Sequence, residues 1–151
     1  MADGPGGDAR RGAGNSVPVI NRASAGYPAD FTDLSYPSRV AEQYVGCPEV
    51  SDTGAFAVRV HGQSMTPKYR EGDIVIFAPS LAARSGDDCF VHFGDGQTTF
   101  KRIFFETDGD GHALMIRLQP RNEKYRATFA KREQVSGLYR AIYRYQRLDE
   151  D

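Results

Sequence analysis

The strongest constraint on the fold is a period of two in the side chains, which dominates the chain from Phe56 onward. Runs rich in Val, Ile, Phe, Tyr and Thr follow one another, and this composition and period are typical of strands. Six runs are expected to be strands, at residues 56–60, 73–77, 89–93, 98–106, 112–119 and 134–147. Almost no helical period is present. The chain is therefore predicted to be all-β, as a small domain that is strongly bent or barrel-like.

Short turns separate these runs. Gly94-Asp-Gly96 predicts a hairpin between the third and fourth runs, and Asp108-Gly-Asp-Gly111 predicts another between the fourth and fifth. The second turn resembles the start of a calcium loop, but it lacks the third ligand, the spacing and the terminal glutamate of an EF-hand. We interpret it as a plain turn, and we predict no metal site and no cofactor.

The chain changes character along its length. Residues 1–15 are dominated by Gly, Ala, Asp and Arg, so they are predicted to be a disordered leader. Residues 16–50 are rich in Pro, Tyr and Ser and are expected to form an extended arm, with one short helical turn at most, that lies over the domain. Residues 51–148 are expected to form the domain itself.

Charge and composition exclude some classes of function. The 151 residues carry a formal net charge of -1 without a basic block, so we expect no direct DNA binding by this chain. No apolar run reaches the length of about 18 residues that a membrane span needs, and no signal-peptide core is present, so a cytoplasmic location is expected. Cys47 and Cys89 have no neighbours at metal-ligand spacing and are interpreted as reduced.

Two residues offer chemistry if the fold brings them together. Ser64 lies in the turn His61-Gly-Gln-Ser-Met-Thr-Pro67, where its hydroxyl is exposed and neighbouring N–H groups can converge as in an oxyanion hole. Lys101 lies in a predicted strand with large apolar side chains on both faces, so its amine is expected to be partly dehydrated and its charged form disfavoured. A neutral amine can act as the general base for a serine hydroxyl. Thr99 shares the face of Lys101 and is placed to hydrogen-bond the amine.

Each residue also has an ordinary interpretation. A serine in a glycine-rich turn is usually only a turn residue, and a strand lysine usually lies on a solvated face. His61, His92 and His112 could suggest a Ser-His-Asp triad, but they follow no pattern. We therefore favour lysine over histidine as the base.

Several motifs in order support the pair. They are Gly-Gln-Ser-Met at 62–65, Gly-Asp at 72–73, Thr-Phe-Lys-Arg at 99–102 and Pro-Arg-Asn-Glu-Lys-Tyr at 120–125. Together they resemble the LexA/UmuD family of self-cleaving serine peptidases, which includes the C-terminal domains of phage repressors. The resemblance implies a LexA-type C-terminal peptidase domain.

The resemblance also implies roles for single residues. Ser64 would be the nucleophile and Lys101 the neutral general base, while the backbone N–H groups of Gln63 and Ser64 would form the oxyanion hole. Thr99 and Met65 would support them. Such a Ser-Lys dyad makes the chain a serine endopeptidase that cuts itself.

In this family the substrate is the protein's own arm, cut at an Ala-Gly or Cys-Gly bond. Ala25-Gly26 supplies such a bond here, with Gly26 lying 38 residues before Ser64. Small residues on both sides of the bond would let an extended segment enter a narrow cleft. We therefore expect Ala25-Gly26 to be the scissile bond.

The resemblance implies a switch in a DNA-damage (SOS-type) response. Only 25 residues precede Gly26, too few for a helix-turn-helix domain, so the plan is expected to be UmuD-like, as in a subunit of an error-prone polymerase, or repressor-like without the DNA-reading head. A RecA filament on single-stranded DNA is the expected trigger, and a homodimer is expected. One alternative is a non-cleaving dimerisation or regulatory domain of a repressor that lacks its helix-turn-helix. The other is a relative of signal peptidase I, which shares the Ser-Lys dyad, but the missing membrane anchor argues against it.

Overall fold

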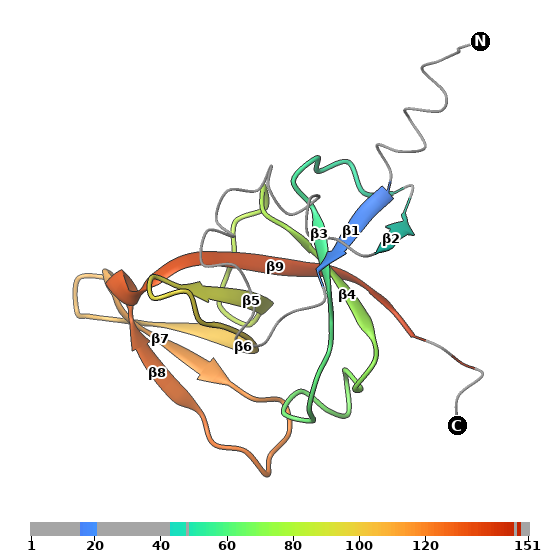
Figure 1. Cartoon of the computed structure of the whole chain (residues 1–151). Helices are drawn as coiled ribbons and strands as arrows, with labels where there is room; N and C mark the ends of the chain where they lie inside the picture. The colour runs from blue at the N-terminus through green and yellow to red at the C-terminus, as the bar shows by residue number, and fades with distance from the viewer. Residues whose placement is uncertain (1–15, 21–42, 48, 147, 149–151) are drawn as a thin grey trace.

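The computed structural model describes residues 16–20, 43–47, 49–146 and 148, and these residues form one mixed β-sheet (Figure 1). The strands are β1 Ser16–Ile20, β2 Gln43–Gly46, β3 Phe56–Arg59, β4 Ile74–Ala78, β5 Asp88–Phe93, β6 Thr98–Thr107, β7 Ala113–Gln119, β8 Thr128–Lys131 and β9 Val135–Tyr145. A short 3-10 helix, η2 Arg132–Gln134, precedes β9. The described residues contain no α-helix, so the all-β prediction is confirmed. They also contain no helix long and apolar enough to cross a membrane.

The last strand, β9, holds the sheet together. The strand order is β2-β1-β3-β4-β9-β5-β6-β7-β8, so β9 lies between β4 and β5 and pairs antiparallel with both. Its register shifts beside Phe77 of β4 and beside Phe93 of β5, and such bulges bend a sheet. Figure 1 shows β9 as a long curved ribbon that crosses the molecule, with β3 and β4 at one end and β7 and β8 at the other.

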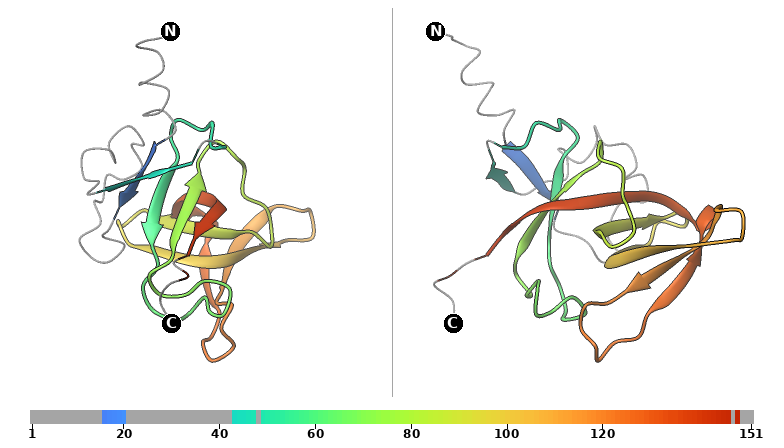
Figure 2. Two further views of the ribbon diagram at one scale, coloured as in Figure 1. Left: turned by 90° about the vertical axis from the view of Figure 1, so that its right-hand side faces the viewer. Right: turned by 180° about the vertical axis from the view of Figure 1, so that it is seen from behind.

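The two described ends of the expected arm add strands to this sheet. β1 pairs antiparallel with β2 and parallel with β3, as the blue and teal strands of Figure 2 show. Val17, Val19 and Val45 are buried and pack against Ala57 of β3 and Ile76 of β4. Alternating apolar residues give β1 a buried face, so the described ends of the arm contribute to the hydrophobic core.

Strand β6 has apolar side chains on both of its faces, as its sequence predicted. Ile103 is completely buried in one cluster, against which Phe105 packs. Phe100 packs against the other cluster, where its ring centroid lies 4.8 Å from that of Tyr69. Lys101 therefore lies in a strand that two separate hydrophobic clusters cover.

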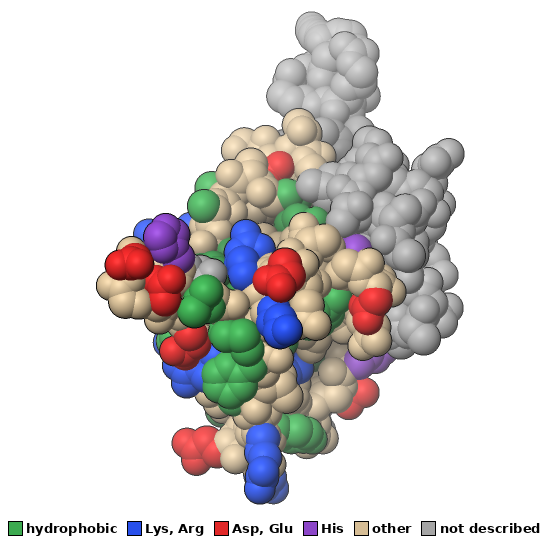
Figure 3. Space-filling model, turned by 90° about the vertical axis from the view of Figure 1, so that its left-hand side faces the viewer, with side chains coloured by type: hydrophobic (Ala, Val, Ile, Leu, Met, Phe, Trp, Pro, Cys, Tyr) green, Lys and Arg blue, Asp and Glu red, His purple; other side chains and the backbone are tan. Residues whose placement is uncertain are grey.

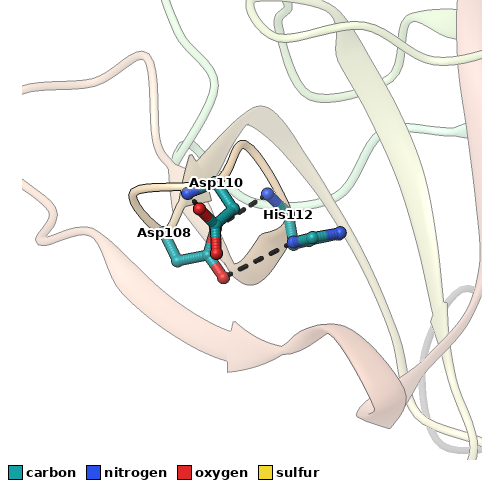
Figure 4. Close-up of side chains that lie close together, drawn as sticks. All are labelled: Asp108, Asp110 and His112. Atoms are coloured by element: carbon teal, nitrogen blue, oxygen red, sulfur yellow. Dashed lines mark hydrogen bonds and ion pairs between the residues drawn. The ribbon is translucent and has the colours of Figure 1, made fainter.

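The hairpin between β6 and β7 is a capped turn. The Oδ1 atom of Asp108 accepts the backbone N–H groups of Asp110 and His112, each at 2.9 Å (Figure 4). The side chains of these three residues place possible metal-ligand atoms within 4.8 Å of one another, but those of Asp110 and His112 are exposed. Asp108 is half-buried and already serves as the acceptor of the turn, which explains the cluster without an ion.

The face of the molecule on the left of Figure 1 carries side chains of every kind. Figure 3 shows hydrophobic, acidic and basic side chains next to one another on this face. Its strands β7 and β8 expose Leu114 and Phe129, each at 54%. Neither charge sign dominates the view.

Candidate active site

The loop that carries Ser64 connects β3 to β4 and is closed at its base by backbone hydrogen bonds. Val60 N–H donates to the carbonyl of Asp73 at 2.8 Å, and Gly72 N–H donates to the carbonyl of Val60 at 2.9 Å. Gly62 and Gly72 have φ angles of 80° and 98°, in the left-handed region that glycine adopts without strain. The two glycines thus turn the chain out of β3 and back into β4.

Met65 fixes the loop to the hydrophobic core. Its side chain is 2% exposed and belongs to the same cluster as Phe77 and Phe90. Its carbonyl accepts the N–H of Tyr69 at 3.0 Å, which closes a tight turn after the serine. Ser64 precedes this anchor and is half-buried, so it lies at the boundary between core and solvent.

Ser64 and Lys101 line the same cleft, which has a volume of about 210 Å³. The walls of the cleft also include Thr99 of β6 and His61 of the loop. Its apolar lining consists of Val58, Val60, Met65, Val75, Phe77, Phe90 and Phe100. The fold thus brings together two residues that are 37 positions apart. Within the described part of the chain no hydrogen bond joins their side chains, and the Lys101 amine instead donates to Thr99 Oγ1 at 2.8 Å.

Burial changes the acidity of Lys101. The side chain is half-buried, and this desolvation lowers the pKa of the Lys101 amine below its ordinary value of 10.5. The hydrogen bond to Thr99 orients the amine within the cleft. The structure therefore agrees with the sequence argument on the direction of the shift and on its cause.

The backbone N–H groups of Gln63 and Ser64 differ in their hydrogen bonding from the carbonyl of Gln63. Within the described residues the backbone N–H groups of Gln63 and Ser64 donate to no acceptor. The carbonyl of Gln63 accepts three hydrogen bonds, from Thr66 N–H at 3.2 Å, Thr66 Oγ1 at 2.9 Å and Asn122 Nδ2 at 2.9 Å. These bonds hold the carbonyl end of Gln63.

Asn122 clamps the serine loop from the connection between β7 and β8. Its backbone N–H donates to the carbonyl of Ser64 at 3.0 Å, and its Nδ2 also donates to Thr66 Oγ1 at 2.9 Å. Its Oδ1 accepts the N–H of Lys124 at 2.9 Å, which fixes the side chain. This asparagine belongs to the motif at residues 120–125, but the sequence alone gave no role for it.

The histidines and cysteines take no part in the pair. His61 is exposed at the cleft wall, whereas His92 is buried with its Nδ1 2.7 Å from Ser136 Oγ. His112 belongs to the turn described above. Cys47 and Cys89 are buried and free, and burial raises the pKa of the Cys89 thiol to about 12.

The expected cleavage bond, Ala25-Gly26, lies outside the described residues. The preceding strand is described, and it ends beside the cleft. Ile20, the last residue of β1, pairs with Val58, which lines the cleft.

The bent all-β sheet and its cleft are consistent with a LexA-type peptidase domain. The chain belongs to the Peptidase S24-like family, whose model matches residues 18–139. It is 30% identical over 133 residues to the LexA repressor of Leptospira biflexa and 31% identical over 133 residues to that of Leptospira interrogans. These matches cover 86% and 85% of this chain and 59% of each repressor. It is also 36% identical over 88 residues to the prophage repressor CohE of Escherichia coli, covering 58% of this chain and 39% of CohE. The chain thus spans about three fifths of the LexA repressors it matches.

Proposed function

We propose that this chain is a regulatory serine peptidase that cuts its own Ala25-Gly26 bond. The observation that carries the proposal is the shared cleft of Ser64 and Lys101, in which burial favours the neutral amine. Membership in a peptidase family and similarity to proteins named LexA repressor and prophage repressor support it.

The proposed reaction begins with proton transfer. The neutral Nζ of Lys101 takes the proton from Ser64 Oγ, which attacks the carbonyl carbon of Ala25. The oxygen of that carbonyl gains the negative charge and accepts hydrogen bonds from the N–H groups of Gln63 and Ser64. When the tetrahedral intermediate collapses, the C–N bond breaks, and the Lys101 ammonium returns the proton to the nitrogen of Gly26. Water then hydrolyses the ester between Ala25 and Ser64, with Lys101 again as the base.

The position of β1 supports cutting within one molecule. Ala25 lies five residues after Ile20, and Ile20 pairs with Val58 at the cleft. Five extended residues reach at most about 17 Å, so the tether to β1 limits how far the bond can lie from the cleft-lining Val58. Such tethering raises the effective concentration of the substrate, because the reaction no longer depends on diffusion.

The proposed biological role is inferred from similarity to the same repressors. We propose that cutting switches a DNA-damage (SOS-type) response, with a RecA filament on single-stranded DNA as the trigger and a homodimer as the working form. Similarity to repressors favours a repressor-like switch, while a UmuD-like polymerase subunit is the second candidate. Addition of RecA, nucleotide and single-stranded DNA at neutral pH tests the trigger directly, since cleavage should then accelerate.

The peptidase activity is tested by incubating the purified chain between pH 7 and 10. We expect a new N-terminus at Gly26, detected by mass spectrometry, with faster cutting at high pH because more Lys101 is neutral. Ser64→Ala and Lys101→Met should abolish the product, while His61→Ala serves as the matched control at the cleft wall. An intact chain at every pH would favour a non-cleaving regulatory or dimerisation domain, and a product that persists in Ser64→Ala would show that Ser64 is not the nucleophile.

A further inference from the structure

Asp88, the first residue of β5, is a buried carboxylate with three side-chain donors. It is 7% exposed and accepts Lys68 Nζ at 3.0 Å, Tyr69 OH at 2.8 Å and Arg121 Nε at 2.8 Å. Two of the donors carry positive charge, so the buried negative charge is paired. Hydrogen bonds to ionised groups are shorter and stronger than those between neutral groups.

The donors come from the two loops that hold the serine. Lys68 and Tyr69 follow Ser64 in the β3–β4 loop, and Arg121 lies in the connection between β7 and β8. Arg121 directly precedes Asn122, whose N–H donates to the carbonyl of Ser64. One carboxylate therefore fastens both sides of the contact that holds Ser64.

The pKa shifts of Asp88 and Tyr69 agree with a charged carboxylate at Asp88. Burial alone would raise the pKa of Asp88, but the hydrogen bonds from Arg121, Tyr69 and Lys68 outweigh it and hold that pKa below its ordinary 3.8. Burial, together with the bond to Asp88, raises the pKa of Tyr69, so its hydroxyl keeps its proton and remains a donor. The Asp88 side chain is thus a charged carboxylate that accepts a hydrogen bond from the protonated Tyr69 hydroxyl.

We propose that Asp88 is a positioning residue for Ser64, because it locks the serine loop and the Asn122 loop into one arrangement. This role rests on the proposed function of Ser64 as nucleophile. Asp88 itself is absent from the lining of the cleft and acts only through the two loops. A shift of about 1 Å in a reacting group can cost on the order of 10²-fold in rate, so loosening the lock should slow cutting.

The test compares Asp88→Asn with Asp87→Asn. Both remove one negative charge at neighbouring positions, but the Asp87 carboxylate lies 3.7 Å from Arg140 and accepts the N–H of Arg84, and neither residue belongs to the serine loop. We expect Asp88→Asn to lower the maximal rate of self-cleavage by about tenfold or more, without moving the midpoint of the pH profile that Lys101 sets. Asp87→Asn should stay within about twofold of the unchanged chain.

Hydrogen exchange gives a second measurement that does not require cleavage. The N–H of Tyr69 donates to the carbonyl of Met65, and the N–H of Asn122 donates to the carbonyl of Ser64. We expect both to exchange at least about tenfold faster in Asp88→Asn, with no change in the buried amides of β9. If Asp88→Asn is too unstable to purify, Tyr69→Phe removes a single donor and should give the same pattern with a smaller amplitude.

The outcomes separate this inference from the proposed function. Unchanged exchange and an unchanged rate in Asp88→Asn would overturn the positioning role and leave the peptidase proposal intact. If the unsubstituted chain never cleaves itself, the peptidase proposal is wrong. Faster exchange of both loop amides in Asp88→Asn would then still show that Asp88 holds the serine loop, and unchanged exchange would show that it does not.

Discussion

Truncation of Asn122 to alanine tests how strongly the serine loop depends on its clamp. Asn122→Ala removes three side-chain hydrogen bonds, to Gln63 O, Thr66 Oγ1 and the N–H of Lys124, each 2.9 Å long. A typical bond contributes about 0.5–1.5 kcal/mol, and partly exposed partners recover some of that from water. We therefore expect the free energy of unfolding to fall by about 1–2 kcal/mol, or about 3–6 °C in Tm for a chain of this size.

The rate of cutting should fall further than this loss of stability explains. The backbone bond from Asn122 to Ser64 survives the substitution, but the loop gains freedom, so we expect a decrease of about tenfold or more at a temperature where the variant is folded. Thermal denaturation gives the first quantity, and the appearance of the Gly26 N-terminus gives the second. Asn122→Asp keeps an acceptor for Lys124 but turns an acceptor oxygen toward the Gln63 carbonyl, so it should lose at least as much stability as Asn122→Ala. Glu123→Ala, at an exposed neighbour, is the control.

Two results would refute this reasoning. If Asn122→Ala has the same Tm as the unsubstituted chain, the three side-chain bonds contribute nothing net to stability. If the variant is less stable but cuts at the normal rate, the position of Gln63 and Ser64 does not depend on the clamp.

Three further predictions concern the base and the core. The rate of self-cleavage should rise with pH and level off above a midpoint lower than 10.5, because burial lowers the pKa of Lys101 and only the neutral amine accepts the proton; a rate that falls across this range would contradict the lysine base. Thr99→Val should shift that midpoint to lower pH and reduce the maximal rate, since the charged amine loses its acceptor; an unchanged pH profile would show that Thr99 has no influence. Gly137→Ala should destabilise the fold by about 1–3 kcal/mol in a thermal melt, because the added Cβ would lie 2.6 Å from Cζ of the buried Tyr139 ring; a normal Tm would mean that the ring can move.

Composition and residue pattern were sufficient to predict six of the described strands. The expected runs correspond to β3, β4, β5, β6, β7 and β9 with small differences at their ends. β8 was missed because its four residues include one buried side chain, Ala130, too few to show a period. Residues 16–20 and 43–46 become strands through pairing with each other and with β3, a long-range property that local pattern does not contain.

Part of the candidate site could likewise be predicted from the sequence, and part could not. The motifs around Ser64 and Lys101 predicted one cleft, and the apolar residues on both faces of β6 predicted the direction in which the pKa of the lysine moves. The Asp88 cluster was not predicted. Its members come from a loop, a strand start and a second loop, and polar residues in such places are ordinarily solvated. Only the folded chain shows that they converge.

The position of β9 has a consequence for the timing of synthesis. Ser64 follows β3, in the half of the sheet made by β1 to β4, while Lys101 lies in β6, in the half made by β5 to β8. The sheet order joins these halves through β9, residues 135–145, which leave the ribosome after both halves have been made. A nascent chain therefore carries both reactive residues and the bond to be cut before it can bring them together. The strand β9 thereby delays assembly of the cleft until both halves of the sheet have been synthesised.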